Sequence, residues 1–400
     1  MPDELIKPHG SDTLNPLYVQ DEAKRAALIK EAASLPSIVV CSQAAANAVM
    51  LGGGYFNPLK GYMGLAESLK VAEKMETSSG LFWPVPIVNV VKDASAVQGA
   101  KRIALKDPNV AGNPVIAIQD VEAIEKATDE QMKFMAEKIF GTTDDKHPGV
   151  ANWLAAGNTF ISGPIQVLNY SYFPTDFPGT FKTATEIRDI IAKHGWKKVV
   201  AFQTRNPMHR AHEELVKMAM KEVGADGAVI HMLLGKLKAG DIPADVRDAA
   251  IRKMVELYFE PNTVEVTGYG YDMLYAGPRE ALLHAVFRQN MGATTLITGR
   301  DHAGVGSYYG PFDAQAIFDE IPKDALKIGI YRGDNTVWCR KCNAIVMVRD
   351  CPHTSEDYLT LSGTKVREML SQGEAPPPEF SRPEVAKILS DYYRSDRAKA

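Results

Sequence analysis

A short segment, residues 203–212, combines side chains that could bind a polyphosphate. It reads Gln-Thr-Arg-Asn-Pro-Met-His-Arg-Ala-His. A proline disfavours a helical residue before it, so we expect a helix to begin near His209. His209 and His212 would then share one face of the first helical turn, where free N–H groups and the helix dipole already favour an anion. Arg205 would add further donors for phosphate oxygens. The alternative is that one or both histidines only cap or pack the helix.

A second segment, residues 299–306, has a similar character. It reads Gly-Arg-Asp-His-Ala-Gly-Val-Gly. Its glycines would let the backbone approach a ligand closely, and Arg300 and His302 would supply donors. A glycine-rich turn by itself is also compatible with a purely structural role. We expect a binding role because the segment would lie opposite residues 203–212.

Three of the four cysteines stand close together in the sequence. Cys339 and Cys342 form a Cys-x-x-Cys pair, and Cys351 and His353 follow shortly after. Three thiolates and an imidazole suit a tetrahedral Zn²⁺, or Co²⁺ in its place. Four cysteines in 400 residues are too few for a disulfide scaffold. The cluster therefore predicts a metal site, with three reduced and packed cysteines as the alternative.

The elements that must position these segments are expected in the middle of the chain. Between residues 173 and 330, β-branched and aromatic runs alternate with helical patterns. The expected strands are 197–202, 228–234, 264–267, 294–298 and 326–331, and the expected helices are 209–223, 244–259, 278–291 and 313–320. This alternation predicts a Rossmann-like domain with a parallel, doubly wound sheet. Ligands bind outside the carboxyl ends of strands in such sheets, and both segments directly follow an expected strand.

Two further domains are expected on either side, which makes the fold class α/β with domains at 1–172, 173–330 and 331–400. The first has short apolar runs separated by turn residues, as is typical of a β-rich domain. The last is expected to be a small α/β domain that holds the cysteines. Outside the central domain, helices are expected at 66–75, 121–140, 365–372 and 383–393.

Composition limits the function classes. The formal net charge is −4 and the pI is near 6.2, which argues against a protein whose main task is to bind nucleic acid. Hydrophobic residues make up 45% and charged residues 24%, as in globular enzymes, which excludes a disordered or collagen-like chain. No apolar run reaches the roughly 18 residues that a transmembrane helix needs. Residues 1–7 are too acidic for a signal peptide, so we expect a cytoplasmic protein.

Residues 203–212 and 299–306 resemble the two signature motifs of the ATP sulfurylase (sulfate adenylyltransferase) family. The resemblance covers nearly the whole chain and includes residues 57–64, 83–87, 142–149, 277–281 and 308–311. It implies an N-terminal PUA-like domain and a central nucleotidyltransferase domain. It also implies the single-function form, because a chain of 400 residues leaves no room for an APS kinase domain.

The resemblance implies roles for individual residues. Gln203 and Arg205 would hold sulfate, together with the backbone near Ala303. The catalytic residues would be Thr204, Arg205 and Asn206. The ATP-binding residues would be Gln203, Thr204, Arg205, Asn206, His209, His212, Gly299, Arg300, Asp301, His302 and Val348. Some bacterial and archaeal members hold a metal with three cysteines and one histidine; here Ser355 stands where that histidine is expected, which leaves His353 as the candidate.

The implied reaction joins ATP and sulfate to form adenosine 5′-phosphosulfate (APS) and pyrophosphate, and it is reversible. Sulfate is already ionised, so it needs no general base, and one of its oxygens would attack the α-phosphorus in line. Mg²⁺ on the phosphates would share the charge that develops. The implied partners are ATP, sulfate, APS and pyrophosphate, without nucleic acid or membrane, and we expect a homodimer.

Two other function classes remain open. The first is another adenylyltransferase of the same superfamily with a different acceptor, against which Gln203, Arg205 and Ala303 argue. The second is a non-enzymatic RNA-binding protein, because the N-terminal domain resembles a PUA-like domain. The net charge of −4 and the absence of a basic stripe count against RNA binding.

Overall fold

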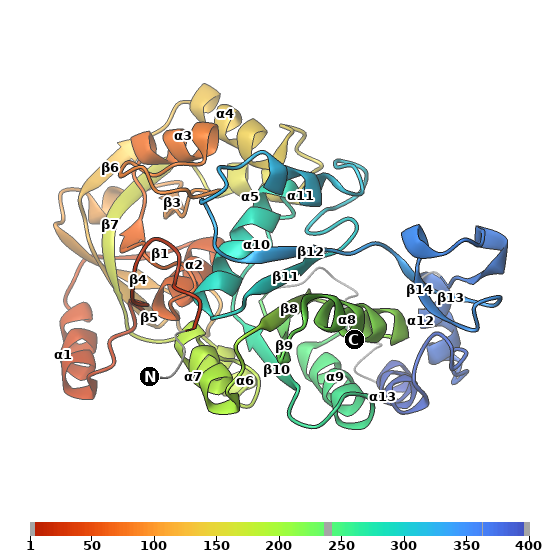
Figure 1. The fold of residues 1–400 in the computed structure, drawn as a ribbon. Coiled ribbons are helices and arrows are strands. Elements are labelled where there is room, and N and C mark those ends of the chain that lie inside the picture. Colours follow the sequence, from red (N-terminus) through yellow and green to blue (C-terminus); the bar gives the residue numbers. More distant parts are fainter. Residues whose placement is uncertain (1–4, 236–241, 362, 396–400) are drawn as a thin grey trace.

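The described residues form three sheets, which follow one another along the sequence (Figure 1). The structure, a computed structural model, describes residues 5–235, 242–361 and 363–395. Residues 1–4 of the segment that we judged unlike a signal peptide lie outside this description. Within it, no helix has both the length and the apolar character needed to cross a membrane.

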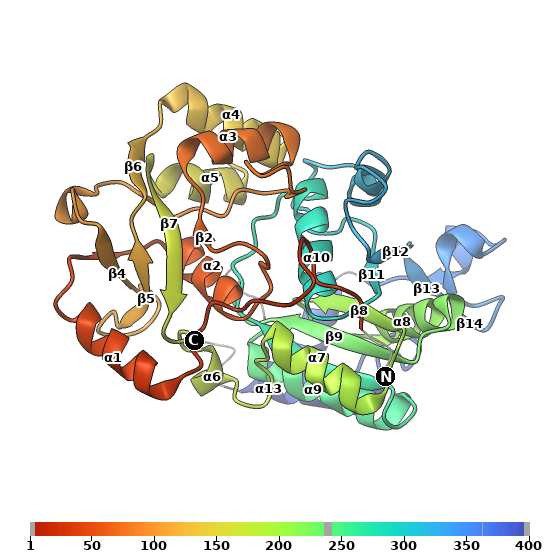
Figure 2. The same cartoon turned by 60° about the vertical axis from the view of Figure 1, so that its left-hand side comes forward.

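A mixed sheet forms the core of the N-terminal part, and the long strand β7 (Thr159–Val167) holds it together (Figure 2). Strand β7 pairs antiparallel with four others, and β4 continues the sheet by pairing with β5 and, in parallel, with β1. These strands are β1 (Ser37–Val39), β2 (Gly61–Tyr62), β3 (Val90–Val91), β4 (Arg102–Lys106), β5 (Val115–Asp120) and β6 (Ala123–Lys126). The helices of this part are α1 (Glu22–Ala32), α2 (Ser42–Gly52), α3 (Leu65–Lys74), α4 (Asp129–Phe140) and α5 (Pro148–Ala155).

One expected helix of the N-terminal part begins later than predicted. We expected a helix over 121–140, but β6 occupies the first part of that range and α4 begins at Asp129. The reason is local: the Thr128 hydroxyl accepts from the Gln131 N–H, and the Gln131 side chain accepts from the Thr128 N–H. This capping box satisfies the free N–H groups at Thr128 and starts the helix there.

The central part is a five-stranded parallel sheet in the order β10-β9-β8-β11-β12. Its strands are β8 (Val199–Thr204), β9 (Gly227–Leu233), β10 (Val264–Tyr269), β11 (Thr295–Thr298) and β12 (Gly329–Arg332). Helices α8 (Arg210–Val223) and α9 (Ala244–Tyr258) lie on one side of the sheet and α10 (Pro278–Asn290) lies on the other (Figure 1). The two short helices α6 (Phe173–Asp176) and α11 (Asp313–Ala316), together with α7 (Ala184–His194), complete this part. The prediction of a doubly wound parallel sheet is confirmed, with strand and helix ends displaced by a few residues.

Helix α10 lies between the central sheet and the N-terminal part, and every residue from Glu280 to Asn290 is buried. The Asn290 side chain donates to the carbonyl oxygens of Tyr55 and Asn57, both in the N-terminal part. The Arg279 guanidinium donates to three carbonyl oxygens of the same part. Helix α10 therefore joins the two parts by hydrogen bonds as well as by packing.

The C-terminal part is small, and it packs against the helices of the central sheet. Its antiparallel strands are β13 (Thr336–Cys339), β14 (Ala344–Met347) and β15 (Tyr358–Leu359), and its helices are α12 (Gly363–Ser371) and α13 (Pro383–Arg394). Helix α13 packs on α9. The Arg382 guanidinium donates twice to the buried Glu213 carboxylate of α8, at 2.7 and 2.9 Å. A partly buried, doubly hydrogen-bonded ion pair of this kind helps to orient one part on the other.

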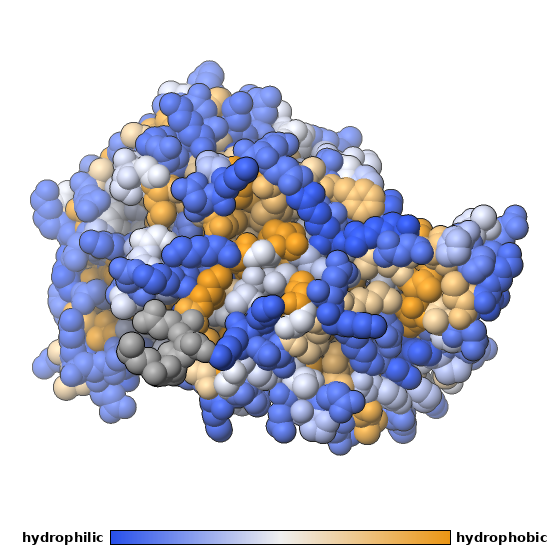
Figure 3. Space-filling model, in the orientation of Figure 1, coloured by the Kyte–Doolittle hydropathy of each residue, from blue (hydrophilic) through white to orange (hydrophobic). Residues whose placement is uncertain are grey.

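The surface shows no extended apolar area among the large side chains that the structure describes as exposed. These are Ile29, Val39, Leu154, Leu257 and Phe312, and they lie on different segments of the chain. In Figure 3, hydrophilic residues dominate the face shown, with hydrophobic residues visible as separate areas between them. Single exposed apolar residues are normal for a folded domain.

Candidate active site

The two motif segments meet where the strand order of the central sheet reverses. The chain leaves β8 toward α8 on one side, and the neighbouring strand β11 leads into residues 299–306. A cavity of about 380 Å³ opens at this point. Its walls include Gln203, Thr204, Arg205, Asn206, His209 and His212 from the first segment and Gly299, Arg300, Asp301, His302 and Ala303 from the second. A crevice at the carboxyl ends of the strands, beside the reversal of strand order, is the usual ligand site of such sheets.

Of the residues expected at the nucleotide, Val348 alone does not line this cavity in the described structure. It lies next to it, because the Val348 N–H donates to the carbonyl oxygen of Asn335, which does line the cavity. Val348 begins a 3-10 turn directly after β14.

One buried nitrogen of Arg205 has no hydrogen-bond partner among the described residues. Thr204 and Asn206 form a local turn in which the Thr204 hydroxyl donates to the Asn206 carbonyl oxygen at 2.7 Å. This turn projects Arg205, whose guanidinium lies 5.2 Å from the ring centre of Tyr275. The Arg205 Nη1 and the Gln203 Oε1 are buried, and neither has a hydrogen-bond partner among the described residues. Buried polar atoms of native proteins are nearly always paired, so these atoms fit the oxygens of a bound anion, with the Gln203 amide turned to present its N–H₂.

The two histidines of the first segment lie at the start of α8, as expected. His209 precedes the first helical residue, and its N–H donates to the His212 Nδ1 at 3.3 Å. Because that nitrogen accepts, a neutral His212 carries its proton on Nε2. Burial lowers the pKa of His212 to about 4. Burial, and then the neighbouring His212, lower the pKa of His209 well below its ordinary value. Both rings are therefore neutral donors and acceptors near pH 7, and the positive charge at the cavity comes from Arg205 and Arg300.

A C-terminal residue closes one side of this histidine pair. The ring of Phe380 stacks on His209 at 4.7 Å with an angle of 24° between the planes. The Arg210 N–H donates to the Phe380 carbonyl oxygen at 3.1 Å. The C-terminal part thus contributes to the burial that keeps His209 neutral.

The second segment forms a tight backbone turn backed by a buried polar chain. Asp301 and Ala303 both have φ of 55°, and the Ala303 carbonyl oxygen accepts from the Gly277 N–H. The His302 Nε2 lies 3.0 Å from the Nδ1 of His284, which is buried in α10. Burial lowers the pKa of His302 to about 3. Near the start of the segment, Arg300 pairs with Asp301 at 3.2 Å and is partly exposed.

Several residues near the cavity were not predicted from the sequence. Glu280 and His284 lie four residues apart on α10, and a buried helix that carries both an acid and a histidine is a signal that could have found them. Tyr275 carried no such signal, because its contact with Arg205 depends on a backbone turn at φ of 62°.

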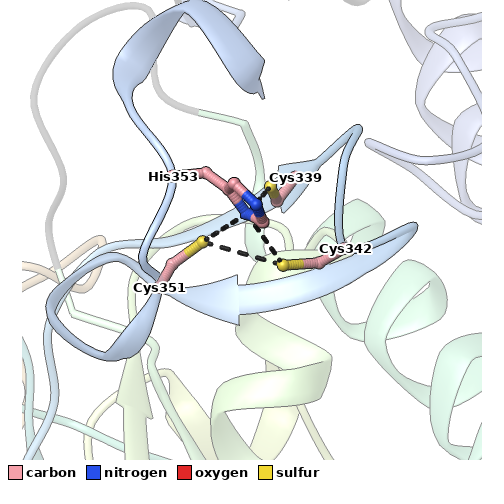
Figure 4. Close-up of side chains that lie close together, drawn as sticks. All are labelled: Cys339, Cys342, Cys351 and His353. Carbon is pink, nitrogen blue, oxygen red and sulfur yellow. Dashed lines mark hydrogen bonds between the residues drawn. The ribbon is translucent and has the colours of Figure 1, made fainter.

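The cysteine cluster is assembled at one end of the C-terminal sheet (Figure 4). The His353 Nδ1 lies 3.4 Å from the Cys339 Sγ, 3.2 Å from the Cys342 Sγ and 3.6 Å from the Cys351 Sγ. All four donor atoms lie within 4.8 Å of one another. Ligand distances of about 2.0–2.3 Å around a tetrahedral metal place neighbouring donor atoms about 3.4–3.8 Å apart, so the group fits such an ion. His353, rather than Ser355, completes it.

A second and larger cavity, about 570 Å³, lies between the N-terminal and central parts. Its walls are largely apolar, and no lysine, arginine or histidine among the described residues lines it. Without a cation it does not suit ATP or sulfate. It adjoins the first cavity, because Met273 lines both.

Comparison with known proteins identifies the family. The family model ATP-sulfurylase matches residues 179–392, and the model of a PUA-like domain matches residues 6–170. This chain belongs to the ATP-sulfurylase family. The PUA-like match agrees with the β-rich N-terminal part, and the ATP-sulfurylase match contains both motif segments and the cysteine cluster.

Relatives in this family match along their full length. A sulfate adenylyltransferase of Alcanivorax borkumensis is 66% identical over 98% of this chain and 98% of its own length. A sulfate adenylyltransferase of Allochromatium vinosum is 65% identical over 98% of this chain and 99% of its own. Among solved structures, a hexameric APS kinase from Thiobacillus denitrificans superposes with a TM-score of 0.74 at 24% identity, covering 97% of this chain and 69% of that one. This last likeness concerns the fold alone.

Proposed function

We propose that this ATP-sulfurylase family member is a sulfate adenylyltransferase that forms APS and pyrophosphate from ATP and sulfate, reversibly. The observation that carries the proposal is the cavity at the reversal of strand order, where the Arg205 Nη1 is a buried donor without a partner among the described residues. The names of relatives that are 65–66% identical over the whole chain support the same activity.

The residues divide into three roles. Gln203, Arg205 and the backbone near Ala303 hold sulfate. His209, His212, Gly299, Arg300, Asp301, His302 and Val348 bind ATP, together with residues 203–206. Thr204, Arg205 and Asn206 act at the reacting groups. The support for this division is that all of these residues except Val348 line one cavity of suitable size.

The chemistry requires positioning and charge stabilisation rather than proton transfer. A sulfate oxygen attacks the α-phosphorus of ATP, the bond from that phosphorus to the bridging oxygen breaks, and pyrophosphate leaves. Arg205 stabilises the added charge, and the neutral imidazoles of His209 and His212 donate N–H groups without a competing proton equilibrium. Mg²⁺ bound to the phosphates would neutralise part of the charge of ATP.

We also propose a metal site, a location and an oligomeric state for this protein. Cys339, Cys342, Cys351 and His353 hold a structural Zn²⁺, or Co²⁺ in its place, away from the reacting groups. The protein works as a cytoplasmic homodimer and binds neither nucleic acid nor membrane. The Cys₃His geometry supports the metal site, and the absence of a membrane-spanning helix in the described residues supports a protein that does not cross a membrane.

The test is sulfate-dependent exchange of pyrophosphate into ATP by an Arg205→Ala variant. We expect the rate to fall by about 10²–10³-fold, because one buried donor to the transition-state charge is lost. Arg205→Lys, which keeps the charge but loses the planar fork, should retain more activity. Circular dichroism and the melting temperature check that the fold is intact.

Two outcomes would contradict the proposal. Arg205→Ala could retain wild-type exchange, or the unaltered protein could exchange pyrophosphate equally well when a phosphomonoester replaces sulfate. The second outcome would favour the alternative adenylyltransferase with a different acceptor.

A further inference from the structure

We propose that Tyr275 is a positioning residue for Arg205, and that His147 and Glu280 hold Tyr275 in that position. The inference deepens the proposed function and rests on it. It assigns to the N-terminal part a direct influence on the sulfate subsite, because His147 belongs to that part and lies at the start of α5.

The Tyr275 ring contacts the Arg205 guanidinium without neutralising its charge. The Tyr275 ring centre lies 5.2 Å from the guanidinium carbon. An aromatic face attracts a cation without accepting its in-plane N–H groups. A carboxylate in the same place would neutralise Arg205 and occupy the donors that an anionic substrate needs. The aromatic contact therefore restricts the direction of the side chain while the Nη1 stays without a partner among the described residues.

The backbone of Tyr275 needs outside support to present the ring in this way. Its φ of 62° is a left-handed conformation that bulky residues rarely adopt. Such residues persist when the surrounding structure holds them, and they are concentrated at functional sites.

Glu280 holds the backbone on both sides of Tyr275. Its Oε1 accepts from the Leu274 N–H at 2.9 Å, and its Oε2 accepts from the Ala276 N–H at 3.0 Å. Glu280 is fully buried in the first turn of α10. One buried carboxyl group thus accepts from the N–H groups of the residues on either side of the left-handed residue.

His147 holds the carbonyl group of Tyr275. The Nε2 lies 3.1 Å from the Tyr275 oxygen, and because a carbonyl only accepts, this nitrogen carries the proton. The Nδ1 accepts from the N–H groups of Gly149 and Val150, so the ring is neutral and its tautomer is determined. The approach is very close: a Cβ at Gly149 would lie 2.1 Å from the Leu274 carbonyl oxygen. Residues 147–149 therefore pack directly against the segment that carries Tyr275.

The experiment compares Tyr275→Leu with Tyr275→Phe in sulfate-dependent ATP–pyrophosphate exchange. Leucine removes the aromatic face, whereas phenylalanine retains it at the same backbone strain. We expect Tyr275→Leu to raise the KM for sulfate about tenfold or more with a much smaller change in the KM for ATP. Tyr275→Phe should recover most of that loss. A general loss of structure would raise both KM values and lower the melting temperature. A rise in the KM for sulfate without a similar rise in the KM for ATP is therefore specific to positioning.

A double-mutant cycle tests the role of His147. We expect His147→Ala to raise the KM for sulfate, and we expect His147→Ala with Tyr275→Leu to be no worse than Tyr275→Leu alone, because both changes remove the same support. A KM for sulfate in Tyr275→Leu within twofold of the wild-type value would overturn the proposal, and fully additive losses in the double variant would overturn the role of His147. If the unaltered protein shows no sulfate-dependent exchange, the proposed function fails instead.

Discussion

Burial changes what a histidine contributes to an anion site. We expected Arg205, Arg300 and the histidines of the two segments to supply donors to a bound anion. Burial lowers the pKa of His212 to about 4 and that of His302 to about 3, so near pH 7 these rings are neutral. Neutral imidazoles still donate through one nitrogen, and they do so without the large desolvation cost of a buried cation.

At the residue scale, the lowered pKa of His212 predicts how stability depends on pH. The imidazole has an ordinary pKa of 6.5, so the unfolded chain takes up a proton before the folded one does as pH falls. The free energy of unfolding should therefore decrease between about pH 6.5 and pH 4. His212→Gln removes this contribution, so its free energy of unfolding should decrease less. Urea unfolding of both proteins at pH 7.5, 6 and 5 measures the two dependences.

Comparing how steeply the free energy of unfolding changes with pH in the two proteins separates the effect of His212 from that of other titrating groups. Burial raises the pKa of Glu280 from 4.5 to about 7, which acts with the opposite sign because the folded state then binds the extra proton. That contribution is the same in both proteins and cancels. Parallel slopes in wild type and His212→Gln would show that His212 is not held neutral by the fold.

At the element scale, β13 joins the cavity to the cysteine cluster. Thr336, at its start, lines the cavity, and its hydroxyl donates to the Ala211 carbonyl oxygen of α8 at 2.9 Å. Cys339, at its end, belongs to the metal-ligating group. Four residues of strand span roughly 10 Å between first and last Cα, so a metal at the cluster would anchor the strand without reaching the reacting groups.

Loss of one thiolate should therefore affect stability more than chemistry. We expect Cys342→Ser to lose bound zinc and to melt several degrees lower, with exchange activity at low temperature largely retained. Elemental analysis of protein purified without chelator and a thermal melt are the measurements. Cys41→Ser is the matched control, because Cys41 lies outside the cluster and should leave the zinc content unchanged. Wild-type protein without zinc or cobalt would contradict the assignment.

At the scale of the whole molecule, α10 connects the N-terminal part to the site. Arg279 donates to the carbonyl oxygens of Pro84, Val71 and Ala72, and the last two lie in the final turns of α3. Burial lowers the pKa of Arg279 to about 10, which still leaves it charged at pH 7. A charged donor to several carbonyl oxygens at a helix C-terminus stabilises their contact.

Removal of this connection should weaken the docking of the two parts. We expect Arg279→Met to lower the free energy of unfolding by about 3 kcal/mol, since buried carbonyl oxygens lose a charged donor. Arg279→Lys keeps the charge but reaches fewer of the three oxygens. Its free energy of unfolding should therefore lie between those of the wild type and Arg279→Met. Urea unfolding measures the change, and an unchanged midpoint in Arg279→Met would show that other contacts hold the parts together.

The amino-acid sequence by itself determined the central sheet and the place of the site. Strand and helix periodicity are local properties, and parallel strands must bring their carboxyl ends to one edge, so residues 203–212 and 299–306 had to meet there. The spacing of the cysteines likewise indicated the cluster. In the N-terminal part, α1 and α2 and the strand within 121–140 escaped prediction, because their short, mixed patterns do not separate helix from strand.

Only the tertiary structure decided what the residues of the site can do. Burial by distant segments, such as Phe380 over His209, determines which groups carry charge. The course of the backbone after Cys351 determines that His353 completes the cysteine group. Tyr275 acquires its contact with Arg205 only because a carboxylate and a histidine from two other elements hold its backbone. These properties depend on contacts between residues far apart in the chain, and local sequence patterns carry no record of such contacts.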